Sequence, residues 1–185
     1  APRKSAAESG VATPVSVEIV GSEADAHFFL TSGYMTTNGK NSNLIAGDHY
    51  YSILSPGSSP AAICVGATSY RTGFVNYKGE RIKFNCGEKG ERGPYSSMGP
   101  TFDGRVKPDV MAQGSPTNIL SERGTLTSVM GTSFSCPIVA GLTACLWQEH
   151  REMTALQIID LVRSLGDNFS HPDNVYGYGV PDFSK

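Results

Sequence analysis

Apolar and polar residues alternate over short stretches in the first half of the chain and follow helical spacing near its end. The alternation predicts half-buried strands at 15–19 and 26–34 and a hairpin over 74–84. The short run 61–67 is apolar on both faces, which is typical of a central strand in a parallel sheet. Residues 106–111 are predicted to form another short strand. The pattern therefore predicts a β-rich start followed by an α/β arrangement.

Two helices are predicted at the end of the chain. The first runs from Ser133 to His150 and is apolar on nearly every side, which predicts a helix that is buried all round. Gly141 in its interior costs about 1 kcal/mol against Ala, so we expect its backbone to pack closely against a neighbour. The second helix begins at Thr154, whose spacing to Gln157 predicts a capping box. Its inner face is expected to carry Leu156, Ile159 and Val162.

The same pattern divides the chain into three parts. Residues 1–14 are small and polar and are expected to form a linker or a frayed terminus. Residues 15–47 are expected to form a β-rich insert or an elaborated loop, and residues 48–185 hold the α/β part. The first residues include Arg and Lys but no apolar run, so we expect no signal peptide here. Because the chain also lacks an initiator Met, we expect it to derive from a longer protein.

Composition narrows the class of protein. With 39% hydrophobic and 17% charged residues, the 185-residue chain can build a core, which excludes global disorder. The formal net charge of −2 favours neither nucleic acid nor an anionic membrane as a partner. No run of about 18 apolar residues is present, so we expect no membrane span.

The four cysteines do not suggest a metal site. No C-x-x-C pair is present and no His stands at ligand spacing, so we expect no zinc site. Cys64, Cys136 and Cys145 lie in apolar or small-residue runs, which predicts buried free thiols that act as small hydrophobic side chains. A disulfide remains an alternative. The cysteines therefore do not indicate whether the protein works in a reducing or an oxidising compartment.

The segment with the clearest chemistry is GTSFSCP at 131–137. A Ser in the first turn of a helix lies beside backbone N–H groups that have no partner within the helix. The helix dipole adds partial positive charge at the same place, and both features stabilise a developing oxyanion. Gly131 and Thr132 are expected to form a tight turn that exposes the Ser133 hydroxyl. The alternative is an ordinary N-cap serine.

Four segments, in order along the chain, resemble the subtilisin-like serine peptidases. The first is YYSI at 50–53 with VGAT at 65–68, and the second is YSSMGPT at 95–101 with DGRVKPDVMA at 103–112. The third is GTS at 131–133 with Pro137 and VAG at 139–141, and the fourth is GYGVPD at 177–182. The resemblance covers about residues 48 to 183. It implies a three-layer α/β fold with a mostly parallel sheet, incomplete in this chain, plus the β-rich N-terminal segment.

The resemblance also implies roles for single residues. Ser133 is then the nucleophile, and its own backbone N–H forms part of the oxyanion hole beside Gly131. Thr132 and Phe134 line the site on the leaving-group side. Asp109 makes a structural hydrogen bond. The implied activity is that of a serine endopeptidase, secreted or in the cell envelope, which needs no cofactor. Calcium is common in the family, but no carboxylate cluster here supports it.

Part of the family pattern is missing from the chain. The family places its catalytic Asp in Asp-Ser/Thr-Gly, its His in His-Gly and its oxyanion Asn in Ala-Ala-Gly-Asn, and none of these settings occurs. None of the four histidines fits the role of the base, and each is expected to be structural. They are His27, His49, His150 and His171. A serine hydroxyl without an adjacent base is a poor nucleophile, so the chain alone is expected to be inactive.

Two hypotheses account for the missing residues. In the first, the N-terminal half of the same catalytic domain, here named the companion half, supplies Asp, His and Asn, in cis before cleavage or as a second chain. In the second, the chain is a catalytically inactive subtilisin-like scaffold used for binding. A further hypothesis gives residues 15–47 a role in binding polymer or steering substrate, against a plain elaborated loop. The preserved Gly131, Thr132 and Ser133 favour the first hypothesis, with protein or peptide as substrate.

Overall fold

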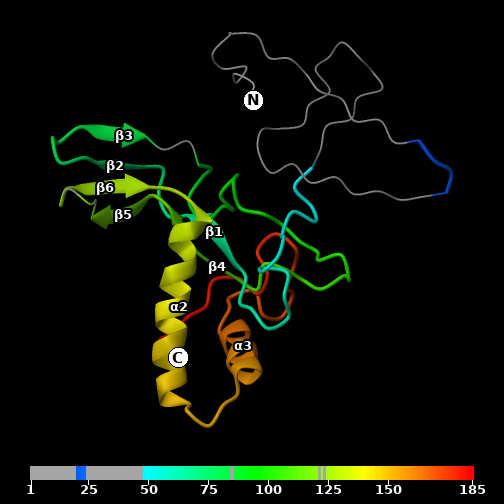
Figure 1. Ribbon diagram of the computed structural model, residues 1–185. Helices are drawn as coiled ribbons and strands as arrows, with labels where there is room; N and C mark the ends of the chain where they lie inside the picture. Colours follow the sequence, from blue (N-terminus) through cyan, green and yellow to red (C-terminus); the bar gives the residue numbers. More distant parts are fainter. Residues whose placement is uncertain (1–19, 24–47, 84–85, 121, 123) are drawn as a thin grey trace. The chain divides into compact units, whose positions relative to one another are not determined.

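A computed structural model of the chain describes residues 20–23, 48–83, 86–120, 122 and 124–185 (Figure 1). The chain divides into two units, Ala1–Asp48 and His49–Lys185. In the first unit, residues 20–23 are described and form no helix or strand. The predicted strands at 15–19 and 26–34 lie outside the described residues, as do the linker 1–14 and most of the segment 15–47.

The sheet of the second unit is built on a parallel pair of strands. Strand β1 (Val65–Ser69) pairs with β4 (Val110–Ser115), with Ala67 opposite Ala112. Both strands are almost entirely buried, as two apolar faces require in a parallel sheet. The central strand predicted at 61–67 and the short strand predicted at 106–111 are both confirmed, but each begins four residues later than the pattern indicated.

The later start has a physical cause. Pro108 has no N–H to donate to a ladder, and the next residue, Asp109, bonds to Cys64 with its side chain as well as with its backbone. One of its carboxylate oxygens accepts the Cys64 N–H at 2.6 Å, and the Asp109 N–H donates to the Cys64 carbonyl at 2.8 Å. The residues before β1 and β4 are therefore joined through a side chain, and regular pairing begins only after them.

Two helices pack against this sheet. Helix α2 (Thr132–Glu149) contacts β1 and β4, and α3 (Ala155–Ser164) packs beside α2 (Figure 1). Both helices were predicted, and the capping box between Thr154 and Gln157 is confirmed. The core lies where both helices meet β4 and consists of Val110, Ala112, Val139, Ile158 and Val162.

Two antiparallel hairpins extend from the parallel pair. The predicted hairpin is confirmed: β2 (Gly73–Val75) pairs with β3 (Arg81–Lys83) around a turn in which the Asn76 carboxamide oxygen accepts two backbone N–H groups. The second hairpin, β5 (Thr117–Leu120) with β6 (Leu126–Val129), connects β4 to α2. The sequence pattern did not predict this hairpin.

The C-terminal tail covers the second edge of β4. The Met111 N–H donates to the Gly179 carbonyl at 2.8 Å, and the Tyr178 N–H donates to the Asp109 carbonyl at 2.9 Å. Gly177 lies so close to β4 that an added Cβ would stand 2.1 Å from the Pro108 carbonyl oxygen. The family-like GYGVPD turn therefore completes the sheet at this edge.

Several expectations about burial are wrong. In α2 only Ser135, Val139 and Thr143 are buried, so the described residues fully cover one side of the helix and leave the rest partly or fully exposed. Apart from its chain neighbours and the backbone of its own helix, no described residue lies within 4 Å of a Cβ placed on Gly141, so the expected close neighbour is absent from the described part of the chain. The pattern showed an apolar helix but could not show which sides this chain would cover.

Two smaller corrections concern α3 and the thiols. Leu156 is exposed, and Ile158 takes the expected inner position beside Ile159 and Val162. All four cysteines are free, but Cys136 and Cys145 are exposed on α2 and were expected to be buried. Cys86 is buried and Cys64 is half-buried.

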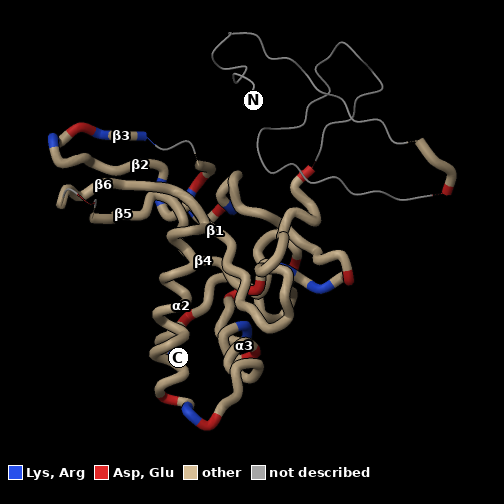
Figure 2. The backbone as a smooth tube through the Cα atoms, viewed as in Figure 1, with Lys and Arg blue, Asp and Glu red and all other residues tan. Residues whose placement is uncertain are grey.

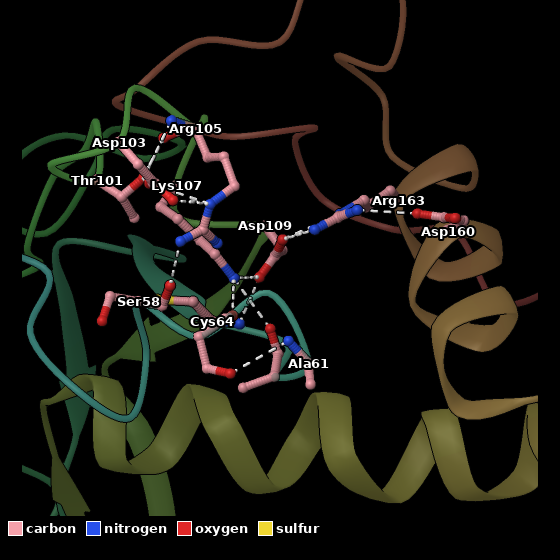
Figure 3. Close-up of polar contacts among 12 residues, drawn as sticks. Ser58, Ala61, Cys64, Thr101, Asp103, Arg105, Lys107, Asp109, Asp160 and Arg163 are labelled. Atoms are coloured by element: carbon pink, nitrogen blue, oxygen red, sulfur yellow. Dashed lines mark hydrogen bonds and ion pairs between the residues drawn. The ribbon is translucent and has the colours of Figure 1, made fainter.

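A buried polar network ties β4 to its surroundings (Figure 3). Asp109 accepts hydrogen bonds from Lys107 Nζ at 2.5 Å and from the Arg163 guanidinium of α3 at 2.6 and 3.0 Å. Lys107 Nζ also donates to the carbonyls of Ser59 and Ala62. Asp109 therefore has the structural role predicted for it, and it joins the 58–64 loop, β4 and α3.

Candidate active site

The turn before α2 places Ser133 at the protein surface. Gly131 is the N-cap residue of α2 and adopts φ 145° and ψ 152°, a conformation that residues with a Cβ rarely adopt. Helix α2 begins at Thr132, so the exposed Ser133 lies in its first turn. The predicted tight turn is confirmed, and its backbone conformation explains why glycine is needed there.

Helix α2 is attached to the end of β4 by two hydrogen bonds. The Gly131 N–H donates to the Gly114 carbonyl at 2.9 Å, and the Ser135 hydroxyl donates to the Gln113 carbonyl at 3.1 Å. Gly114 permits this approach, because an added Cβ would stand only 2.8 Å from the Ser135 hydroxyl oxygen. Ser133 is therefore held near the carboxyl end of a parallel strand, where open α/β sheets bind their ligands.

Tyr95 lies under the same turn. Burial raises the pKa of its phenol, and hydrogen bonds with the Ser115 side chain and the Gly131 backbone partly offset that rise. The hydroxyl stands 3.0 Å from the place of a Cβ on Gly114. Sequence reasoning placed Tyr95 in a family-like segment but gave no sign that it supports the turn, because the contact joins residues more than thirty positions apart.

A cavity of about 180 Å³ lies beside the turn. Of the predicted site residues, Thr132 lines it, whereas Gly131, Ser133 and Phe134 do not. The other lining residues come from the first two family-like segments and from the residues between 53 and 65: Ser52, Ile53, Leu54, Gly57, Cys64, Val65, Gly66, Ser96, Ser97 and Pro108. Sequence analysis gave these residues no role in the site, and the family resemblance was the only signal that grouped most of them.

No histidine of the described residues forms a hydrogen bond with Ser133. His150 is the C-cap of α2, roughly 25 Å from Ser133 at 1.5 Å per helical residue. His49 and His171 are exposed, and His27 lies outside the described residues. Groups of three or more metal-ligating side chains are also absent from the part of the chain that the structure describes.

Cys64, which lines the cavity, makes stability depend on pH. Burial raises the pKa of its thiol from 9.0 to about 11, with Lys107 lowering it and Asp109 raising it. The unfolded chain ionises this thiol near its ordinary pKa, whereas the folded chain keeps the proton until about pH 11. The stabilisation is therefore complete below pH 9 and is lost as pH rises from about 9 to 11.

We expect the urea midpoint of the wild-type chain to fall more steeply between pH 9 and 11 than that of a Cys64→Ala variant. Comparing how steeply the urea midpoint falls with pH in the two proteins separates the titration of the Cys64 thiol from the pH-independent effect of removing its side chain. Equal slopes in the two proteins would contradict this prediction.

Comparisons with known proteins identify the family. A family model described as the subtilase family, Peptidase_S8, matches residues 31–179. Serine protease AprX of Bacillus subtilis (strain 168) is 31% identical over 103 residues, which cover 46% of this chain and 23% of AprX. None of the described helices has the length and apolar character needed to cross a membrane.

Solved structures agree with the fold. MycP1 with its N-terminal propeptide removed superposes with a TM-score of 0.50 at 26% identity, over 71% of this chain and 38% of that one. Sphericase superposes with a TM-score of 0.53 at 22% identity, over 73% of this chain and 44% of that one. The chain thus spans less than half the length of each of these relatives, and its fold is an incomplete α/β subtilase fold. On the family match and the shared fold together, this chain belongs to the subtilase family.

Proposed function

We propose that the chain carries the nucleophile of a serine endopeptidase and forms an acyl-enzyme on Ser133. The observation that carries the proposal is the exposed residue Ser133 in the first turn of α2, after a glycine turn that is hydrogen-bonded to the end of β4. A nucleophile needs this combination of exposure and rigid support. Family membership supports the same activity.

The chemistry follows from this placement. Ser133 Oγ attacks the carbonyl carbon of a peptide bond while its proton passes to a histidine base. The Ser133 N–H and the positive end of the α2 dipole stabilise the negative charge on the carbonyl oxygen. The C–N bond then breaks, the amine takes the proton from the histidine, and water hydrolyses the remaining ester. No cofactor is needed for these steps, and Thr132 and Phe134 border the leaving-group side.

The companion half supplies the residues that this chain lacks. No described histidine contacts Ser133, and the chain spans less than half the length of its solved relatives, which supports a base located in the rest of the domain. The proposed companion half brings the Asp, the His and the oxyanion Asn, and the substrate is a protein or peptide. As in other members of the family, we place the complete enzyme outside the cell or in its envelope.

The missing base also supports a second candidate, an inactive scaffold that binds without hydrolysis. The intact mass of the native preparation, measured before and after a fluorophosphonate probe, decides between them. We expect a second polypeptide, or one longer chain, and one adduct that maps to Ser133. A chain of 185 residues alone, without an adduct, would overturn the proposal and leave the scaffold.

A further inference from the structure

The chain leaves the sheet after β1 and returns beside the point where it left. The Gly90 N–H donates to the Ser69 carbonyl at 2.8 Å, and the Ser69 N–H donates to the Glu91 carbonyl at 2.9 Å. Residues 70–89, here named the arm, therefore form an excursion that includes the β2–β3 hairpin and is closed at its base by backbone hydrogen bonds.

The arm extends from the end of the sheet at which α2 begins (Figure 1). The Tyr70 N–H donates to the Ser115 carbonyl at 2.7 Å, at the end of β4 to which the turn before α2 is also bonded. Further along the arm, the sulfur atoms of Cys86 and Met130 lie 3.4 Å apart, and Met130 directly precedes the glycine of that turn. The arm is therefore fixed beside Ser133, where it can contact parts of a substrate that lie beyond the bond to be cleaved.

The arm concentrates positive charge. It contains five basic and two acidic side chains, a formal net charge of +3 in a chain whose total is −2. None of the five basic side chains forms an ion pair with a carboxylate among the residues that the structure describes. The arm therefore presents a positive surface that attracts anionic partners. Its basic residues, all exposed, are Arg71, Lys78, Arg81, Lys83 and Lys89 (Figure 2).

Two of these side chains share one face of the hairpin. Arg81 and Lys83 are two positions apart in β3, and such residues lie on the same face of a strand. Their cross-strand partners, Val75 and Gly73, bring no charge to that face. Val75 is 62% exposed. The face is therefore basic with an apolar flank, a combination that fits a peptide with acidic side chains.

Two more basic side chains gather at the base of the arm. The Arg71 guanidinium carbon lies 5.4 Å from the centre of the Tyr70 ring, and Lys89 Nζ lies 5.9 Å from the same centre. Both distances are within the reach of a cation–π contact, and Tyr70 is 52% exposed. A carboxylate that binds at this ring is attracted by both cations.

We propose that the arm binds an acidic stretch of the protein or peptide substrate, outside the bond that is cleaved. This inference rests on the proposed function and adds a class of substrate to it. The place of the arm beside Ser133 favours a peptide over nucleic acid or a membrane as the anionic partner. Exposed charges act over several ångströms without a precise fit, so the arm should lower KM for acidic substrates and leave kcat unchanged.

Two fluorescein-labelled peptides, hexaglutamate and hexaglutamine, test the proposal without hydrolysis. Fluorescence anisotropy measures their binding to the complete native protein carrying Ser133→Ala. We expect hexaglutamate to bind roughly tenfold more tightly at low salt, and we expect this preference to disappear at about 0.5 M NaCl, because salt screens exposed charges. Equal binding of the two peptides at low salt would overturn the proposal. Tighter binding of an oligothymidylate of the same charge would overturn it in favour of nucleic acid.

A matched pair of double variants locates the binding surface. Arg81→Glu with Lys83→Glu reverses two charges on the arm, whereas Arg151→Glu with Lys185→Glu makes the same change in net charge elsewhere. We expect the first variant to bind hexaglutamate roughly tenfold more weakly than the parent protein and the second to stay within about twofold. Equal losses in the two variants, or no loss in the first, would contradict the assignment to the arm.

Kinetics separates this inference from the proposed function. With the active protein, a peptide substrate extended by hexaglutamate should have a KM roughly tenfold below that of the same substrate extended by hexaglutamine, at equal kcat. Arg81→Glu with Lys83→Glu should remove this difference and still form the fluorophosphonate adduct on Ser133 at the wild-type rate. An adduct without any difference between the two substrates would reject the role of the arm and keep the proposed function. A wild-type protein without the adduct would reject both.

Discussion

Replacing Ser133 by Ala should lower peptide hydrolysis by the complete protein by about 10⁶-fold in kcat, the loss that removal of the nucleophile causes in subtilisin, a relative from the same family. The reason is chemical: the variant lacks the hydroxyl on which the proposed acyl-enzyme forms, and the remaining oxyanion stabilisation leaves only a small part of the acceleration. Substrate binding should change little, because the hydroxyl acts mainly in the transition state.

A matched control is Ser164→Ala, which removes an exposed hydroxyl from α3, where it donates to the Leu161 carbonyl at 2.7 Å. We expect kcat and KM of this variant to match those of the wild type. Steady-state kinetics with a peptide substrate checks both variants, and circular dichroism checks that they fold. A Ser133→Ala protein that retains measurable acyl-enzyme formation would place the nucleophile elsewhere.

The largest loss of stability should follow Asp109→Asn. The variant keeps the size of the side chain but removes the charge that faces Lys107, which is 1% exposed, and Arg163. Leaving a buried charge without its partner costs about 3–5 kcal/mol, a large share of the roughly 5–15 kcal/mol that stabilises an ordinary domain. Urea unfolding should therefore show a much lower midpoint.

Asp160→Asn is the appropriate control because Asp160 pairs with the same Arg163 from an exposed position, at 2.8 Å. We expect it to change the free energy of unfolding by about 0–1 kcal/mol, as exposed ion pairs do. Equal midpoints for Asp109→Asn and Asp160→Asn would show that the buried network contributes no more than a surface pair.

The sequence was sufficient for the family, the helix that carries Ser133 and the β2–β3 hairpin. Each of these depends on local information: a motif, a run of apolar residues, or alternation around a turn. The strand positions were shifted because Pro108 and Asp109 interrupt pairing through a side-chain contact with Cys64, which lies 45 positions away and leaves no local signal.

The burial of α2 and the support of the turn were harder to predict. A helix that is apolar on all sides does not reveal which side its own chain covers, and here the covered side holds Ser135 and Thr143. The contact of Tyr95 with the turn at Gly131 likewise depends on how β4 and the loop before it are placed. Such facts follow from tertiary packing, so a single sequence cannot supply them.

The tail that runs along β4 affects how this chain can associate with others. An edge strand with unpaired N–H and C=O groups is a template for intermolecular strand addition and for amyloid. The bonds from Met111 to Gly179 and from Tyr178 to Asp109 occupy this edge, while the Ser69 N–H and the Ala67 carbonyl of β1 bond to the 91–93 segment. Strand addition at these positions of β1 and β4 is therefore blocked by the chain's own residues.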